Sequence, residues 1–199
     1  MRSSLRSQEA AETKVNPADT DDIRMSLQGD GDAYARLMER YQDTVASRMW
    51  RFSREAREPR ELVQEVFVEA FLSLSSYRGA APFEHWLAKI ATFVGYRFWK
   101  NRERTRANEA VPIEEWHLTT SGSPDSMEPT HAADLLHGLL DRLPPRDRLV
   151  LMLRYVEDRS VEETAALAGW TVSMVKVQTW RARRKLKRLS EEAGLEVVS

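Results

Sequence analysis

Lysine and arginine side chains gather in two stretches of this chain, a pattern that indicates binding to a polyanion. The longer stretch has no acidic residue between its ends and comprises Lys176, Arg181, Arg183, Arg184, Lys185, Lys187 and Arg188. The other stretch comprises Arg97, Lys100, Arg102, Arg104 and Arg106. Basic side chains bind phosphate groups through charge and hydrogen bonds. Two separated basic surfaces therefore predict two contacts with one polyanion, although the formal net charge of the chain is only −1.

The longer basic stretch follows the sequence signals of a helix-turn-helix. Ser160 and Glu163 have the spacing of a capping box, which begins a short helix. Gly169 suits the left-handed turn between two crossing helices, and Thr171 can cap a second helix that we expect to reach Leu189. In this motif the second helix enters the major groove of DNA. A basic helix can also be merely solvated, but these signals in this order favour DNA binding.

The side chains of this second helix divide into two expected groups. The residues near its start that can meet base edges are Ser173, Lys176, Val177 and Gln178, and Thr171 is assigned to the same −35 binding surface. A glutamine can pair with adenine and a lysine can donate to guanine, and each good contact contributes about 1–3 kcal/mol of discrimination. The residues further along are expected to hold phosphates, and they are Arg181, Arg183, Arg184, Lys185 and Lys187.

Apolar residues at helical spacing predict an all-α fold of two helical domains joined by a flexible linker. We expect a disordered polar tail at residues 1–17, a helical bundle at 18–106, a linker rich in Pro, Ser and Thr at 107–132, and the helix-turn-helix domain at 133–192.

Within the bundle, one short helix and three long amphipathic helices are expected. The short helix covers Asp19 to Gln28 and is stopped by Gly29 and Gly31. The long ones carry apolar stripes from Tyr34 to Phe52, from Leu62 to Leu74 and from Phe83 to Phe98, and the third is expected to end near Lys100. Three such stripes can bury one another in a bundle.

Composition and spacing exclude several classes of function. The absence of Cys excludes disulfides and thiolate-bound metal, and the scattered residues His85, His117, His131 and His137 do not make a metal-ligand spacing with carboxylates. There is no Gly-rich phosphate loop. We therefore expect no catalytic residue, metal or cofactor, and no enzyme. No apolar run approaches the roughly 20 residues that span a bilayer, so we expect a cytoplasmic protein without membrane insertion.

Several segments resemble one family of bacterial transcription proteins. Four segments are similar to the promoter −35 binding domain of extracytoplasmic function (ECF, group IV) RNA polymerase sigma factors, and they are Leu143 to Tyr155, Ser160 to Gly169, Val175-Lys176 and Arg181-Ala182-Arg183. Residues Glu61 to Phe67 resemble the polymerase-binding helix of that family, and the segment from Tyr77-Arg78-Gly79 to Ile90-Ala91 resembles its −10 segment. The resemblance covers about residues 30–106 and 133–189 in the expected order.

The resemblance implies an initiation factor that docks on core RNA polymerase, through its β′ and β subunits, and directs it to promoter DNA. One domain would read the −35 duplex, and the other would melt and capture the −10 element. Polymerase binding is implied for Glu61, Gln64, Glu65 and Glu69. Binding of the −10 element is implied for Tyr77, Arg78, Trp86, Tyr96, Arg97, Trp99 and Lys100. An anti-sigma factor is a further candidate partner.

Some of these assignments stay open at the level of sequence. Trp86 and Phe98 lie on the apolar stripe, so they can be core residues or DNA contacts, whereas Tyr96 and Trp99 lie off it and favour DNA contact. Gln178 departs from the residue usual in the family, and we expect it to set the −35 preference of this chain. Trp170 is a second departure in the turn.

An ordinary helix-turn-helix regulator is the alternative function. Its N-terminal bundle would sense a ligand or dimerise instead of binding polymerase. That reading explains the C-terminal half equally well, but it leaves the basic and aromatic cluster at the end of the bundle unexplained.

Overall fold

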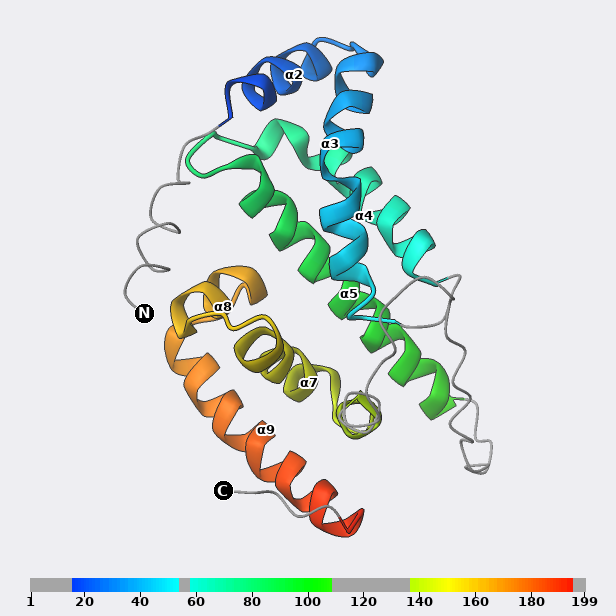
Figure 1. Ribbon diagram of the computed structural model, residues 1–199, viewed down its shortest axis with the longest axis vertical. Helices are drawn as coiled ribbons and strands as arrows, with labels where there is room; N and C mark the ends of the chain where they lie inside the picture. Colours follow the sequence, from blue (N-terminus) through cyan, green and yellow to red (C-terminus); the bar gives the residue numbers. More distant parts are fainter. Residues whose placement is uncertain (1–15, 54–57, 109–136, 195–199) are drawn as a thin grey trace, which may run out of the picture. The chain divides into compact units, whose positions relative to one another are not determined.

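The computed structural model describes residues 16–53, 58–108 and 137–194, and all regular elements within these ranges are helices (Figure 1). The first elements are α2 (Pro17–Leu27), α3 (Gly31–Met49), α4 (Glu58–Ser73), the 3-10 turn η1 (Leu74–Ser76) and α5 (Phe83–Asn108). Residues 137–141 are also helical, and they are followed by α7 (Pro145–Leu151), the π-helical turn η2 (Met152–Val156), α8 (Val161–Ala168) and α9 (Val172–Glu192). The all-α prediction is therefore confirmed.

The described residues form two compact units, one up to Gly95 and one from Tyr96 onward. The expected linker at 107–132 and most of the expected tail at 1–17 lie outside the described residues. The tail prediction was wrong at its last two residues, because the Asn16 side chain caps α2 and Pro17 is the first residue of that helix. Proline suits this position since its missing N–H would have no helical partner there.

Apolar stripes hold the first unit together, as predicted. On α3 the side chains of Tyr34, Leu37, Val45 and Met49 are buried, and they meet buried residues of α4 such as Leu62, Val66 and Phe67. The Tyr34 hydroxyl donates to the Phe67 carbonyl oxygen at 2.5 Å, which satisfies the polar end of a buried ring. Helices α2 and α4 both pack against α3.

One glycine in α5 allows two elements to approach closely. A Cβ atom built on Gly95 would lie 2.3 Å from the ring of Phe52, and that ring is fully buried. Neither the ring nor the helix backbone can move away without opening the core.

We therefore expect Gly95→Ala to destabilise the protein by about 1–3 kcal/mol, because overpacking outweighs the better helix propensity of alanine. The urea unfolding midpoint measures this effect. A matched change at Gly31, where nothing lies within 4 Å of the added methyl group, should leave the midpoint nearly unchanged or raise it. An equal response at both glycines would contradict the proposed close approach.

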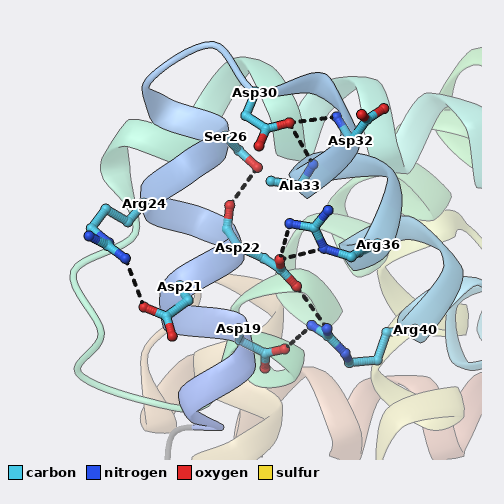
Figure 2. A network of polar contacts seen from close by, with 10 residues as sticks. All are labelled: Asp19, Asp21, Asp22, Arg24, Ser26, Asp30, Asp32, Ala33, Arg36 and Arg40. Atoms are coloured by element: carbon cyan, nitrogen blue, oxygen red, sulfur yellow. Dashed lines mark hydrogen bonds and ion pairs between the residues drawn. The ribbon is translucent and has the colours of Figure 1, made fainter.

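An ionic network joins two buried carboxylates of α2 to two exposed arginines of α3 (Figure 2). Arg40 binds two carboxylates of α2, with Nη1 2.5 Å from Asp19 Oδ1 and Nη2 2.8 Å from Asp22 Oδ2. Arg36 reaches the other oxygen of Asp22 at 2.8 Å. Burial alone would raise the pKa of Asp22, but the hydrogen bonds and charges of Arg40 and Arg36 outweigh it, so this pKa lies below the ordinary value. Ion pairs between charged side chains therefore stabilise the packing of α2 on α3.

The direction of this shift predicts acid lability. Because the folded pKa of Asp22 lies below the unfolded value of about 3.9, its stabilisation is present above about pH 4 and is lost as the pH falls through the folded pKa. Urea midpoints between about pH 3 and pH 6 should show this fall, and Asp22→Asn should weaken it. Asp21→Asn is the control, since its pair with Arg24 is exposed and should contribute little. The same acid profile in Asp22→Asn and in the unaltered protein would refute this assignment.

The second unit contains the predicted helix-turn-helix. Ser160 and Glu163 form the capping box, with the Ser160 backbone N–H donating to Glu163 at 2.7 Å and the Glu163 N–H donating to the Ser160 hydroxyl at 3.0 Å. Gly169 has the left-handed φ of 68° that the turn requires. Thr171 accepts a hydrogen bond from Met174 at 3.2 Å and caps α9. All three local predictions are confirmed.

The third long helix extends further than expected. It continues past Lys100 to Asn108, although the apolar stripe has ended. The added segment contains no Gly or Pro, and its arginines and glutamate are good helix formers that need no buried face. The end of the hydrophobic pattern was therefore a poor guide to the end of the helix.

Candidate nucleic-acid interface

One face of α9 is exposed along the whole helix and is rich in basic side chains. Buried Val175 and Ala182 define the opposite face, which packs on α7 and α8. At helical spacing, the residues that point away from this core face are Ser173, Lys176, Val177, Trp180, Arg181, Arg184, Lys187 and Arg188, and all of them are exposed. Thr171 and Arg183 are exposed beside this set. The helix thus offers a continuous basic surface.

The Gln178 side chain lies near the edge of the core face and is engaged within the protein. Its amide Nε2 donates to Asp147 Oδ1 at 2.5 Å, and Lys185 Nζ binds the other oxygen of that carboxylate at 2.5 Å. Asp147 is buried on α7. The nitrogen with which a glutamine would donate to adenine is therefore occupied in this structure.

Trp180 is an exposed aromatic residue of α9 that the site prediction omitted. Its side chain is 59% exposed, and the guanidinium carbon of Arg184 lies 4.8 Å from the ring centroid. Such cation–π contacts orient an arginine without neutralising its charge. The signal available in the sequence was the spacing of Trp180, four residues after Lys176 and four before Arg184.

The loop before α5 and the first turn of α5 together form a cluster of packed rings. The Phe83 ring is buried and lies 5.5 Å from Tyr77 and 5.3 Å from Trp86, and these two lie 5.6 Å apart. The Tyr77 hydroxyl donates to the Ala81 carbonyl oxygen at 2.6 Å and closes the loop. Arg78 is exposed at its tip. Trp86 is half-buried, so part of its ring packs and part faces solvent.

The remaining residues implied for the −10 element follow along α5. Lys100 is exposed, whereas Tyr96 and Arg97 are half-buried, and the Lys100 ammonium lies 6.0 Å from the Tyr96 ring. Phe98 is half-buried. Trp99 is 4% exposed. The guanidinium carbon of Arg148 lies over its ring, 4.0 Å from the ring centroid.

The expectation that Trp99 offers an accessible ring is therefore not met in this structure. Being off the apolar stripe did not expose it, because the ring finds packing partners on a different face of the helix. Phe93, which the site prediction omitted, is an exposed ring on α5. At helical spacing it shares a face of the helix with Trp86, Lys89, Arg97 and Lys100.

The exposed face of α4 combines acidic and apolar side chains. Glu61 and Gln64 are exposed, and Glu65 and Glu69 are half-exposed. On the same face Val68 and Leu72 are exposed, and Leu72 keeps 73% of its surface. Aliphatic side chains of this size on a helix surface indicate a protein contact more strongly than the glutamates alone. The sequence prediction had noted only the polar residues.

Two further observations bear on the class of function. Among the described residues, no helix is long and apolar enough to cross a membrane, and no group of His, Asp and Glu is placed to hold a metal ion. A helix-turn-helix unit with a basic exposed face, together with a helical unit carrying rings and cations, is typical of a DNA-binding protein.

Comparison with known proteins gives the family. The sigma-70 region 2 model matches residues 37–105, and the sigma-70 region 4 model matches residues 133–186. The ECF RNA polymerase sigma-E factor of Escherichia coli is 30% identical over 167 residues, which cover 79% of this chain and 86% of that protein. The chain belongs to the ECF sigma factors, a family of proteins that direct transcription initiation and are not enzymes.

Other relatives agree with this assignment. The RNA polymerase sigma factor YlaC of Bacillus subtilis is 27% identical over 158 residues, which cover 79% of this chain and 91% of that protein. The fold is similar to that of CnrH, solved in complex with the cytosolic domain of CnrY, with a TM-score of 0.55, 23% identity, and coverage of 88% of this chain and 98% of that one. It is also similar to the sigma factor RpoE of Bartonella quintana, solved with the anti-sigma factor NepR, with a TM-score of 0.54, 21% identity, and coverage of 79% and 96%.

Proposed function

We propose that this chain is a group IV sigma factor whose two domains read two promoter elements in the cytoplasm. Residues 133–192 would bind the −35 duplex, residues 18–106 would bind core polymerase and open the −10 element, and residues 107–132 would tether the two domains. The observation that carries this proposal is the continuous exposed face of α9, opposite the buried Val175 and Ala182. Family membership supports the division of labour between the domains.

Readout of the −35 element follows from the order of side chains on α9. Ser173, Lys176 and Val177 lie in the first two turns, which enter a major groove most deeply in a helix-turn-helix. Trp180 adds an apolar surface that fits thymine methyl groups. Its cation–π contact with Arg184 also fixes the orientation of that guanidinium. Arg181, Arg183, Lys187 and Arg188 surround this centre and can bind the flanking phosphates.

Capture of the −10 element follows from the ring cluster and α5. The closed loop of residues 77–81 exposes Arg78 beside the Tyr77 and Trp86 rings, which suits an unstacked base and its phosphate. Lys89, Phe93, Arg97 and Lys100 then recur every three or four residues along α5. Alternating cations and rings are the surface that a separated strand requires.

We assign the exposed face of α4 to core polymerase. Its carboxylates can meet a basic surface, and Val68 and Leu72 can fill an apolar pocket at the centre of the contact. The structural relatives were solved with partner proteins, one of them named as an anti-sigma factor, so a protein that competes for the sigma factor is a further expected partner.

Run-off transcription with core polymerase and a promoter selected from a randomised library tests the function. We expect sequence-specific initiation that requires this chain. If the chain instead forms a stable homodimer that binds DNA and ignores polymerase, it is an ordinary helix-turn-helix regulator.

The α5 surface also predicts a change in salt dependence. Removing two exposed cations with Lys89→Ala and Lys100→Ala should flatten the slope of log affinity against log salt by about 1.4, since each single-strand phosphate contact contributes about 0.7. The measurement is fluorescence anisotropy of a single-stranded −10 oligonucleotide on the holoenzyme across a salt series. Arg24→Ala, an exposed cation of α2, is the control and should keep the slope. An unchanged slope in the double variant would exclude this path for the strand.

A further inference from the structure

Asp19, a member of the ionic network of Figure 2, makes a further contact outside that network. Besides Arg40, the Asp19 carboxylate binds the Tyr41 hydroxyl, which donates to Oδ2 at 2.6 Å. Asp19 is 1% exposed, so its charge is stabilised by these two donors in place of water. Tyr41 is half-buried on α3. Its hydroxyl is therefore fixed by a residue from the preceding helix.

The Tyr41 ring in turn contacts the cluster formed by the Tyr77, Phe83 and Trp86 rings at the start of α5. Its centroid lies 5.5 Å from that of Phe83, the buried ring on which both Tyr77 and Trp86 pack. Helix α2 also contacts η1, the turn that directly precedes Tyr77. Helix α2 is thus connected to the 77–81 loop in two ways. One is its direct contact with η1, and the other is the series of side-chain contacts from Asp19 through Tyr41 to Phe83.

The two carboxylates of α2 have different neighbours. Asp22 binds only Arg36 and Arg40 and accounts for anchoring α2 to α3. Asp19 shares Arg40 but alone reaches Tyr41. The Asp19 carboxylate is close enough to the loop to raise the pKa of Tyr77, although burial of that phenol is the larger cause. An anchor for α2 would not require the Tyr41 contact.

We propose that Asp19 is a positioning residue for promoter opening: by holding Tyr41 it fixes Phe83, and with it the Tyr77 and Trp86 rings that receive the −10 strand. This inference rests on the proposed capture of the −10 element by the 77–81 loop. It gives α2, which precedes the residues matched by the region 2 model, a part in the opening step. Asp19 acts through other side chains and does not touch DNA.

The test is the rate of promoter opening by the holoenzyme, followed by 2-aminopurine fluorescence in the −10 element at saturating enzyme. Asp19→Asn should slow opening by about tenfold, the effect of losing one hydrogen bond to a buried charge. Tyr41→Phe keeps the ring on Phe83 and removes only the hydroxyl, so it should slow opening similarly. The double variant should be no slower than the slower single one, because both changes remove the same contact.

Asp22→Asn is the matched control, a buried carboxylate on the same helix that does not reach Tyr41. It should lower the melting temperature at least as much as Asp19→Asn and still open the promoter at the normal rate. Equal slowing by Asp22→Asn, or additive effects of Asp19→Asn and Tyr41→Phe, would overturn the inference. A normal rate in Asp19→Asn with a slow Tyr77→Ala would also overturn it, while leaving −10 capture intact. A normal rate in Tyr77→Ala and Arg78→Ala would instead refute the −10 capture itself.

Discussion

Replacing Trp180 by alanine should lower run-off transcription from a cognate promoter by about ten- to a hundredfold and relax the preference at one upstream base pair. The ring lies at the centre of the exposed face of α9, and its loss removes both an apolar groove contact and the support under Arg184. A specific base contact contributes about 1–3 kcal/mol, which corresponds to this range. Transcription from promoters with single upstream substitutions measures both effects.

Gln178→Ala is the contrasting variant on the same helix. Because its amide binds the buried Asp147, we expect a loss of about 1–2 kcal/mol in unfolding free energy and an unchanged upstream preference. Trp180→Phe, which keeps an aromatic ring, should recover most of the activity. If Gln178→Ala relaxed the upstream preference and Trp180→Ala did not, the two assignments would be reversed.

Reversing charge on α4 should strongly weaken polymerase binding. We expect Glu61→Lys combined with Glu65→Lys to weaken the affinity for core polymerase by about a hundredfold or more, since like charges at an interface cost several kcal/mol. Leu72→Ala alone should weaken it less, by removing apolar contact area. The readout is the dissociation constant for core polymerase, measured with labelled protein in solution.

The control for this experiment changes the same charge at the same spacing on another helix. Glu39 and Asp43 are exposed on α3, four residues apart as are Glu61 and Glu65 on α4. Glu39→Lys with Asp43→Lys should keep the polymerase affinity within about threefold at physiological salt, where exposed charges are screened. Equal losses in both double variants would mean that total charge, and not the α4 face, determines binding.

The parts of this fold that local sequence signals determine were predictable. The capping box at Ser160 and Glu163, the left-handed Gly169 and the Thr171 cap each involve residues within a few positions of one another. The apolar stripes predicted the buried faces of α3 and α4 for the same reason. These signals act over one or two helical turns, so a single sequence contains them in full.

The details of the site depend on contacts between distant residues, which spacing does not reveal. Gln178 was expected to meet bases because it lies near the start of α9, but its partner Asp147 is 31 residues away on another helix. Asp19 appeared to be one more acidic residue near the N-terminus, whereas the fold buries it against Arg40 and Tyr41. In both cases the partner of a polar side chain lies far away in the sequence, so only the folded chain shows which contact that side chain makes.

Run-off transcription by core polymerase and this chain, from a library randomised in both promoter elements, tests the central claim most directly. We predict that the transcribed templates are enriched in two separate sequence blocks. Trp180→Ala should weaken only the upstream block, and Tyr77→Ala with Arg78→Ala only the downstream one. Enrichment of a single block, or none above core polymerase alone, would contradict the claim that two domains of one chain read two promoter elements.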